Sequence, residues 1–302
     1  MFMKLGVIGT SRITEDHLKI LKNFKHEVVF LSSTRKNSLN LAKLAKKYRI
    51  KKFFNDWKAA VEYARNIKGC NFLITSRIKD NKKILKECIK LNRYVLIEKP
   101  VFLKEREFKS IKNYKKIFVG YNRIFYDNII KLKNIFNKKK SVNVIAKCPE
   151  TSKLEVMKNS CHIISILIYI FGPLRLIFKK KNLNFINCAF LDRKKNVINL
   201  VCNFKNSDNF SIEFLNRKTR YVLSPIETLK IFKKIEIKKI NNNYTYSPKC
   251  FYVNNEWNSN KFKPGFKNQY KEFIRFTKGK KIVNDMFFSS KIIKICEQKN
   301  KI

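Results

Sequence analysis

A short apolar run, residues 94–97, leads directly into Glu98-Lys99-Pro100, so a carboxylate and an ammonium group follow a predicted strand. In parallel sheets, ligands bind at the edge where the carboxyl ends of the strands lie. A lysine there can hydrogen-bond a substrate hydroxyl and share its proton, while Glu98 partners or orients it. We therefore predict that Lys99 binds substrate and takes part in catalysis. The alternative is one more surface lysine in a lysine-rich chain.

His162, one of three histidines, begins a strongly apolar segment, residues 161–171, that predicts a helix ending at Gly172-Pro173. An imidazole titrates near neutral pH, so His162 could give or take the proton of a reacting oxygen. The alternative is a histidine satisfied within the core. His17 and His26 are interpreted as structural or surface residues.

The strand predicted over residues 4–8 ends in a glycine turn, where dinucleotide-binding folds carry G-x-G-x-x-G/A. This chain has Gly9-Thr10-Ser11-Arg12-Ile13-Thr14, with the first glycine alone. Ser11 keeps a small residue near a pyrophosphate, and the following helix would offer amides and its positive dipole end. The predicted cofactor residues here are Gly9, Thr10, Ser11, Arg12 and Ile13. An ordinary strand-to-helix turn is the alternative.

A second predicted strand, residues 27–31, is followed by Ser32-Ser33-Thr34-Arg35-Lys36. NAD-selective enzymes often carry an acid there for the ribose hydroxyls. Hydroxyl groups with Arg35 suit a 2′-phosphate instead, so Ser33, Thr34 and Arg35 favour NADP over NAD. A solvated loop is the alternative.

Strand and helix signals alternate with short connections through the first 122 residues, which predicts a parallel sheet covered by helices. Longer β-like runs then dominate, at residues 141–147, 185–191, 197–204, 210–215 and 228–237. The predicted fold is therefore α/β: a Rossmann-type NAD(P)-binding domain over residues 1–122, then an α+β domain over residues 123–302 with a large, mainly antiparallel open sheet. Asn/Lys-rich residues 238–243 and 254–260 are expected to be loops.

The formal net charge of +46 is spread along the whole chain, together with many Asn, Ile and Phe residues. Compositional drift explains much of it, and no RNA-binding or helix-turn-helix signal accompanies it, so a nucleic-acid partner is not favoured. The field still attracts anionic substrates. The eight cysteines form no CxxC pair, so no metal is predicted and buried free thiols are expected. With no long apolar span and no leader pattern, the chain is expected to be cytoplasmic, without a membrane partner.

Taken together, these motifs resemble the glucose-fructose oxidoreductase / inositol dehydrogenase (Gfo/Idh/MocA) family. The resemblance rests on KLGVIGTSRI at the start, on E-K-P at residues 98–100, on Val119-Gly120-Tyr121-Asn122-Arg123, and on Ser160-Cys161-His162. It implies an NAD(P)-dependent oxidoreductase that transfers a hydride to or from a sugar or nucleotide-linked sugar, as in surface-polysaccharide synthesis. It also implies a dimer or tetramer, and a cis peptide bond before Pro100.

The resemblance also assigns residues to the site. It places Thr75, Glu98, Lys99, Asn122 and Arg123 at the cofactor. The residues implied to contact the substrate are Lys99, Arg123, His162 and Asn268. Lys99 and His162 are the implied catalytic residues. Gln269, beside Asn268, is a further candidate for contact with a sugar hydroxyl.

The sequence departs from the family pattern at several positions. Lys158 stands where some members have an aspartate, Ser165 replaces the acid of H-x-x-D, and residues 75–77 read Thr-Ser-Arg in place of T-P-N. The acid/base relay is therefore altered. A non-catalytic member, acting as a nucleotide- or sugar-binding regulatory subunit, is the alternative function.

Overall fold

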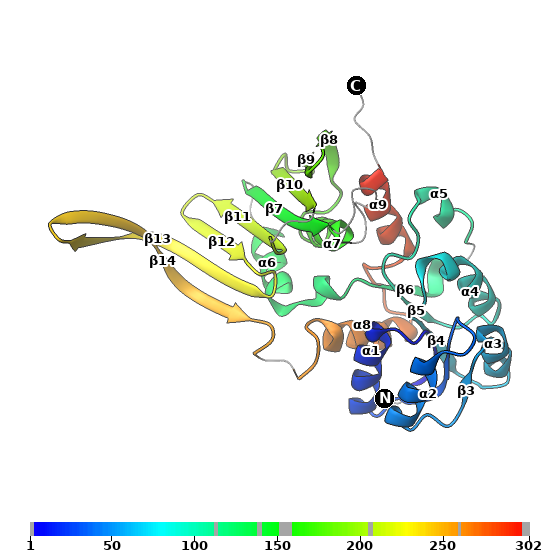
Figure 1. Cartoon of the computed structure of the whole chain (residues 1–302). Helices are drawn as coiled ribbons and strands as arrows, with labels where there is room; N and C mark the ends of the chain where they lie inside the picture. The colour runs from blue at the N-terminus through cyan, green and yellow to red at the C-terminus, as the bar shows by residue number, and fades with distance from the viewer. Residues whose placement is uncertain are drawn as a thin grey trace. The chain divides into compact units, whose positions relative to one another are not determined.

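The computed structural model describes residues 3–111, 114–137, 141–150, 159–204, 208–258 and 261–297 (Figure 1). The contacts divide the chain into two compact units. The first comprises Met1–Asn122 and Gly265–Lys294, and the second comprises Arg123–Pro264 and Ile295–Ile302. A C-terminal stretch thus returns to the first unit, and the division falls inside the last helix.

The first unit contains a parallel sheet in the order β3-β2-β1-β4-β5-β6. Its strands are β1 (Lys4–Ile8), β2 (Glu27–Ser32), β3 (Phe53–Phe54), β4 (Cys70–Ile74), β5 (Val95–Glu98) and β6 (Ile117–Gly120). Apolar residues run almost without interruption along the central strands, as expected where both faces are covered. The strand order reverses between β1 and β4, which is where such sheets bind ligands.

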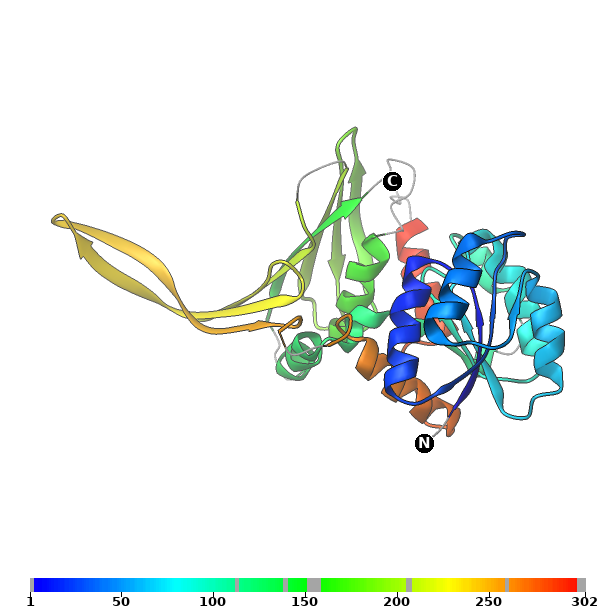
Figure 2. The ribbon, with the colours of Figure 1, turned by 60° about the horizontal axis from the view of Figure 1, so that its bottom comes forward.

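Helices lie on both sides of this sheet (Figure 2). They are α1 (Arg12–Asn23), α2 (Leu39–Tyr48), α3 (Trp57–Arg65), α4 (Ile78–Lys90), α5 (Glu105–Phe108), α8 (Phe266–Thr277) and α9 (Met286–Glu297), with short 3₁₀ turns at Tyr114–Lys116 and Asn122–Phe125. α1 contacts α2 and α8, whereas α3 contacts α4. In α8, Phe273 is buried and its ring centroid lies 5.5 Å from that of Phe118 on β6. α8 is thereby anchored to the sheet.

The second unit contains an open sheet in the order β14-β13-β12-β11-β7-β10-β9-β8. Its strands are β7 (Asn143–Glu150), β8 (Arg175–Lys181), β9 (Phe185–Leu191), β10 (Val197–Phe204), β11 (Ser211–Asn216), β12 (Thr219–Leu223), β13 (Thr228–Ile240) and β14 (Asn243–Asn255). The β7–β10 pair is parallel and the other neighbours are antiparallel. The predicted fold class, a parallel Rossmann-type sheet followed by a large, mainly antiparallel one, is confirmed.

Two helices, α6 (Asp127–Asn137) and α7 (Ser160–Phe171), pack on each other, and α7 packs on β7. Burial alternates along β7: Val144, Ala146 and Cys148 are buried, while Ile145 and Lys147 are exposed. One face of the sheet therefore forms the core of this unit, and the opposite face carries exposed side chains.

β13 and β14 form a long two-stranded ribbon that extends past the other strands of their sheet (Figure 1). The expectation of a loop over residues 238–243 is wrong, because β13 continues to Ile240 and β14 begins at Asn243. The turn is reduced to Asn241 and Asn242, whose φ angles are 48° and 62°. Asparagine tolerates the positive φ that two-residue hairpin turns require. The Asn-rich composition therefore marks a tight turn at this position. The second expected loop, residues 254–260, begins within β14, which ends at Asn255. Residues 259–260 lie outside the described residues.

Seven of the eight cysteines are buried free thiols, as expected, and Cys250 on β14 is exposed. No group of three or more His, Cys, Asp or Glu side chains among the described residues could hold a metal ion. Within the same ranges, no helix combines the length and apolar character needed to cross a membrane.

Candidate functional site

The glycine turn after β1 adopts a backbone that only glycine accommodates without strain. Gly9 has φ +131°, and a Cβ there would lie 2.7 Å from the carbonyl carbon and oxygen of Thr75. The Gly9 amide donates to the Ser32 carbonyl at 2.8 Å. The residues at the carboxyl ends of β1, β2 and β4 therefore pack closely at this turn. The absence of a side chain at Gly9 lets a ligand approach the backbone there.

The start of α1 is held by hydroxyl groups. The Ser11 amide donates to Thr14 Oγ1 at 3.0 Å, and Thr14 Oγ1 lies 2.7 Å from Thr75 Oγ1 in a second hydrogen bond. The first amides of a helix lack acceptors within the helix and carry its positive dipole end. Arg12 is exposed and Ile13 half-buried in this first turn.

A cavity of about 270 Å³ opens where β1, β2 and β4 end. Its lining residues are Gly9, Thr10, Ser11, Ser33, Thr34, Arg35, Ser38, Asn40, Thr75, Ser76 and Arg77. Seven of them are predicted cofactor residues, so the structure brings together three stretches of sequence that were assigned separately. The lining is rich in hydroxyl groups, carries two arginines and contains no carboxylate.

Four lining residues were missed from the sequence: Ser38, Asn40, Ser76 and Arg77. Ser38 Oγ lies 3.2 Å from Thr10 Oγ1, and the Asn40 amide donates to the Thr10 carbonyl at 3.4 Å. These residues begin α2, and a serine before a predicted helix was the available signal. Arg77 Nε donates to Asp80 at 3.1 Å, so Asp80 holds a cavity arginine.

Glu98 ends β5, and its carboxylate is bound to a buried histidine. Glu98 Oε1 lies 2.8 Å from His17 Nε2, while His17 Nδ1 lies 2.8 Å from the Tyr270 hydroxyl. His17 is fully buried, and no motif in the sequence points to its bond to Glu98. His26 is buried as well.

Gly120, at the end of β6, faces the same carboxylate. A Cβ at Gly120 would lie 2.9 Å from Glu98 Oε1, so a larger residue there would require the Glu98 carboxylate to shift. Lys99 directly follows β5 and is half-buried. Its peptide bond to Pro100 is cis, as the resemblance implies. Asn122 is buried. The E-K-P and G-Y-N-R motifs are thus in steric contact.

Two predicted substrate residues meet in the second unit. The Arg123 guanidinium lies 4.0 Å from the ring centroid of Phe210, and the His162 ring centroid lies 6.2 Å from it at an interplanar angle of 89°. Phe210 was not predicted as a site residue; the sequence indicated only that it begins a β-like run, and it lies just before β11. Lys99 belongs to the first unit, and Arg123 and His162 to the second.

A buried carboxylate fixes the start of α7. Glu150 is 2% exposed, and its Oε1 accepts from the amides of Asn159 at 3.2 Å and Ser160 at 2.6 Å. Such a carboxylate satisfies free amides and complements the helix dipole, and it sets His162 in the first turn. Ser165 Oγ donates to the His162 carbonyl at 2.7 Å, and Lys158 lies outside the described residues. Glu150 is an acid near His162 that the sequence did not reveal.

The predicted segment near the C-terminus forms the first turn of α8. Asn268 is half-buried there, and its neighbour Gln269 is fully buried. Neither the oxygen nor the nitrogen of the Gln269 amide has a hydrogen-bond partner among the described residues. Buried amides are nearly always paired, so the Gln269 amide could bind a polar group of a ligand.

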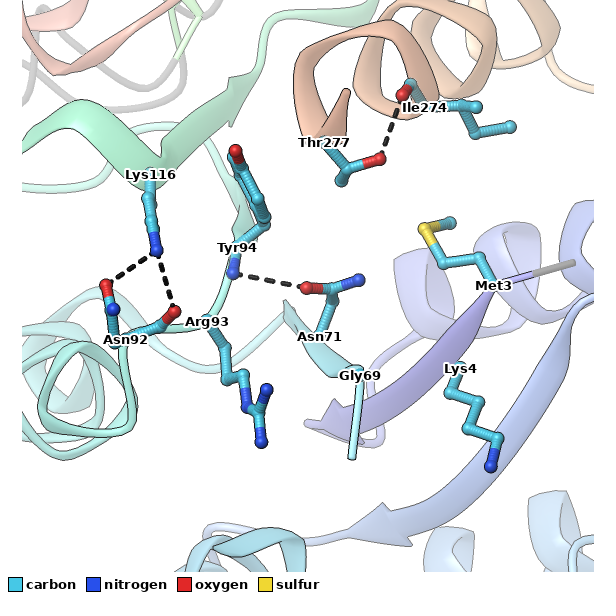
Figure 3. A pocket seen from close by; sticks show the side chains of 10 residues that line it. All are labelled: Met3, Lys4, Gly69, Asn71, Asn92, Arg93, Tyr94, Lys116, Ile274 and Thr277. Carbon is cyan, nitrogen blue, oxygen red and sulfur yellow. Dashed lines mark hydrogen bonds between the residues drawn. The ribbon is translucent and has the colours of Figure 1, made fainter. Parts of the chain in front are cut away.

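A second cavity, of about 500 Å³, lies at the opposite, amino edge of the first unit's sheet (Figure 3). Lys4, Arg93 and Lys116 are among its lining residues, and Lys116 Nζ donates to the Asn92 carbonyl at 3.0 Å. Helices end at this edge, and cations there complement the negative ends of their dipoles. Lys116 thus has local hydrogen-bond acceptors, whereas Arg93 Nε has none among the described residues.

A parallel sheet with this strand order and a glycine turn at its switch point defines a dinucleotide-binding domain of the Rossmann class. Residues 3–117 match the model of the GFO_IDH_MocA family, described as an oxidoreductase family with an NAD-binding Rossmann fold. Over these residues the chain is similar to the Gfo/Idh/MocA oxidoreductases. No curated protein matches the sequence.

Solved structures share the whole fold at low identity. A dehydrogenase from Clostridium difficile is 19% identical with a TM-score of 0.75, over 98% of this chain and 97% of that one. UDP-N-acetylglucosamine 3-dehydrogenase from Acidithiobacillus ferrooxidans is 12% identical with a TM-score of 0.74, over 98% and 95%. Levoglucosan dehydrogenase, solved with NADH and L-sorbose, is 10% identical with a TM-score of 0.73, over 98% and 95%. The likeness therefore extends to both units.

Proposed function

We propose that this protein is an NAD(P)-dependent oxidoreductase that transfers a hydride to or from a sugar or sugar derivative, nucleotide-linked sugars included. The observation that carries the proposal is the cavity at the glycine turn, where Gly9 and Thr75 leave room for a pyrophosphate beside the start of α1. Similar structures act on UDP-N-acetylglucosamine and levoglucosan. The net charge of +46 favours anionic substrates.

The cofactor preference we propose is NADP over NAD. Arg35 and Arg77 line the cavity together with the Ser33 and Thr34 hydroxyls, and no carboxylate accompanies them. The Arg35 amide donates to Ser33 Oγ at 3.0 Å, which fixes the turn that presents the guanidinium. Arginine binds phosphate through several parallel N–H groups.

When bound, the nicotinamide supplies or accepts the hydride. Lys99, at the carboxyl edge of the sheet, hydrogen-bonds the substrate hydroxyl that becomes a carbonyl, and His162 exchanges its proton. Arg123 is available for a negatively charged or hydroxyl-rich substrate, and Asn268 for sugar hydroxyls. Glu150 supports this chemistry through the position it gives α7.

Titration of the purified protein with NADPH and with NADH, monitored by cofactor fluorescence, tests whether the protein binds these cofactors. A panel of sugars and nucleotide sugars with NADP⁺ then tests turnover. Lys99→Met should reduce turnover by a factor on the order of 100 or more and leave cofactor affinity within a few-fold. No cofactor binding by the wild type, or full turnover by Lys99→Met, would end the proposal.

A non-catalytic, nucleotide-binding role is the second candidate. Two observations favour it. Ser11 replaces the second glycine of the dinucleotide motif. Ser165 stands where the family pattern has an acid, and its hydroxyl group donates to the His162 carbonyl. Tight NADPH binding without turnover across the panel would support this role.

We further propose a homo-oligomer built through the second unit. The β13–β14 ribbon has one apolar face, on which Ile237 pairs with Tyr246 and Ile235 with Pro248. Ile235, Ile237, Tyr244 and Tyr246 are each at least 59% exposed. Ile145 and Val197 on the open face of the same sheet are exposed too, so a second copy offers matching apolar surface.

A further inference from the structure

Tyr270, His17 and Glu98 form a hydrogen-bonded chain inside the first unit. The two bonds are 2.8 Å long each, from Tyr270 Oη to His17 Nδ1 and from His17 Nε2 to Glu98 Oε1. Phe266 packs against the imidazole with ring centroids 4.8 Å apart. His17 is fully buried and Tyr270 is 1% exposed, so solvent does not compete for these bonds.

The partners fix which atom donates. An ionised carboxylate only accepts, so His17 Nε2–H donates to Glu98. Where Nδ1 carries no proton it accepts from the Tyr270 O–H, so both ring nitrogens of His17 have a hydrogen-bond partner. Burial raises the pKa of Tyr270 well above its ordinary value, so the phenol stays a donor.

Each residue comes from a different element that contributes to the site. His17 lies on α1, whose start forms the nucleotide turn; Glu98 ends β5 beside Lys99; and Tyr270 lies on α8 next to Gln269. The Glu98 carboxylate is confined on its other side by Gly120. Glu98 Oε2 has no hydrogen bond from any described residue and remains available to a ligand.

We propose that His17 is a positioning residue for the reaction: with Tyr270 it holds the Glu98 carboxylate, and so sets Lys99 relative to the phosphate-binding start of α1. This inference rests on the proposed function. A buried imidazole and carboxylate bring a desolvation cost that an apolar side chain would avoid, so a purely packing role gives no reason for this chain of polar groups. Positioning errors of about 1 Å reduce catalysis by a factor on the order of 100.

Two amide variants separate positioning from packing. His17→Gln places an N–H near the position of Nε2 and keeps the bond to Glu98, whereas His17→Asn reaches only the position of Nδ1. We expect His17→Gln to retain kcat within about 5-fold and His17→Asn to lose kcat by a factor on the order of 100, with KM for substrate changed less. Tyr270→Phe, which removes one hydroxyl group, should give an intermediate loss.

His26→Asn is the matched control, since His26 is also buried in this unit but its ring nitrogens have no hydrogen-bond partner among the described residues. Thermal unfolding of each variant reports folding. Equal losses of kcat in His17→Gln and His17→Asn, with an active wild type, would overturn this inference but not the proposed function. Absent cofactor binding in the wild type would overturn the proposed function first.

A second measurement does not depend on activity. With three histidines in the chain, ¹⁵N-labelled imidazoles can be assigned by substitution and their protonated nitrogens identified by NMR. We expect Nε2 of His17 to carry a proton that exchanges slowly with solvent, because it is hydrogen-bonded to Glu98. An Nδ1–H form, or a ring that exchanges freely with solvent, would contradict the hydrogen-bonded chain.

Discussion

Thr14 and Thr75 share a hydrogen bond of 2.7 Å between their hydroxyl oxygens, which joins the first turn of α1 to the residue after β4. Thr75 is also the residue that a side chain at Gly9 would meet. The glycine turn, the helix start and the end of β4 therefore contact one another at one corner of the proposed nucleotide site. A change at one of the three residues should disturb the other two.

Gly9→Ala should weaken both folding and cofactor binding. Its φ of +131° strains any other residue by about 1–3 kcal/mol, and the methyl group would lie 2.7 Å from the Thr75 backbone. Gly69→Ala is the control, because Gly69 has φ +77° but nothing within 4 Å of an added Cβ. Chemical denaturation and NADPH titration should show a clearly larger loss at Gly9; equal losses would mean that strain alone matters.

Arg35→Ala should reduce the preference for NADPH over NADH by about 10-fold, because a charge-assisted bond to the 2′-phosphate is lost. The affinity for NADH should change little. Arg65→Ala, on α3 and paired with Glu62 at 2.9 Å, removes the same charge away from the cavity. Dissociation constants for both cofactors provide the measurement, and an equal drop in both would argue against a phosphate contact.

Gln269→Leu should stabilise the ligand-free protein by about 1–3 kcal/mol, because it removes a buried amide without hydrogen-bond partners in the described structure. The same change should weaken substrate or cofactor binding, since it removes the groups a ligand would satisfy. Opposite signs in a thermal melt and in a binding titration support a ligand-facing role. Loss of stability together with unchanged binding would show that Gln269 is structural.

His26 should make the protein less stable in mild acid. Burial lowers the pKa of His26 below its ordinary value of 6.5, so the unfolded chain binds a proton that the folded chain does not. The stability is therefore present above pH 6.5 and is lost as the pH falls below it. His26→Phe should flatten the dependence of unfolding free energy on pH in this range, and an unchanged slope would assign it to other groups.

Ile237→Lys with Tyr246→Lys should dissociate the proposed oligomer, because both side chains lie on the apolar face of the β13–β14 ribbon. Thr245→Lys with Ser247→Lys adds the same two charges to the opposite face and is the control. Light scattering after size-exclusion chromatography gives the mass of each variant. A wild type that is monomeric at every concentration would remove the role proposed for the ribbon.

Local patterns predicted much of the first unit. The strand before Gly9 and the strand before Glu98 are short apolar runs followed by polar or glycine turns, and both lie where expected. Among the elements that escaped prediction, α3 carries mixed charges and β8 is rich in lysine. In a lysine-rich chain, polar composition is a poor sign of a loop, as the ribbon shows.

The contacts of the candidate site were less accessible to sequence reasoning. His17 and Tyr270 are separated by 253 positions, and neither side chain carries a motif that points to the other. Glu150 likewise reaches the start of α7 across residues 151–158. Such pairs depend on how helices and strands are brought together in three dimensions, which periodicity and spacing do not encode.

Cys250 gives the ribbon a practical use as an attachment point. It is the one exposed thiol, whereas the other seven are buried, and burial raises the pKa of Cys70 to about 11 and of Cys188 to about 12. Thiolate is the reactive form, so a maleimide dye or spin label should react selectively with Cys250 in the unmodified protein. Distances measured between labels would then report on assemblies without any engineered cysteine.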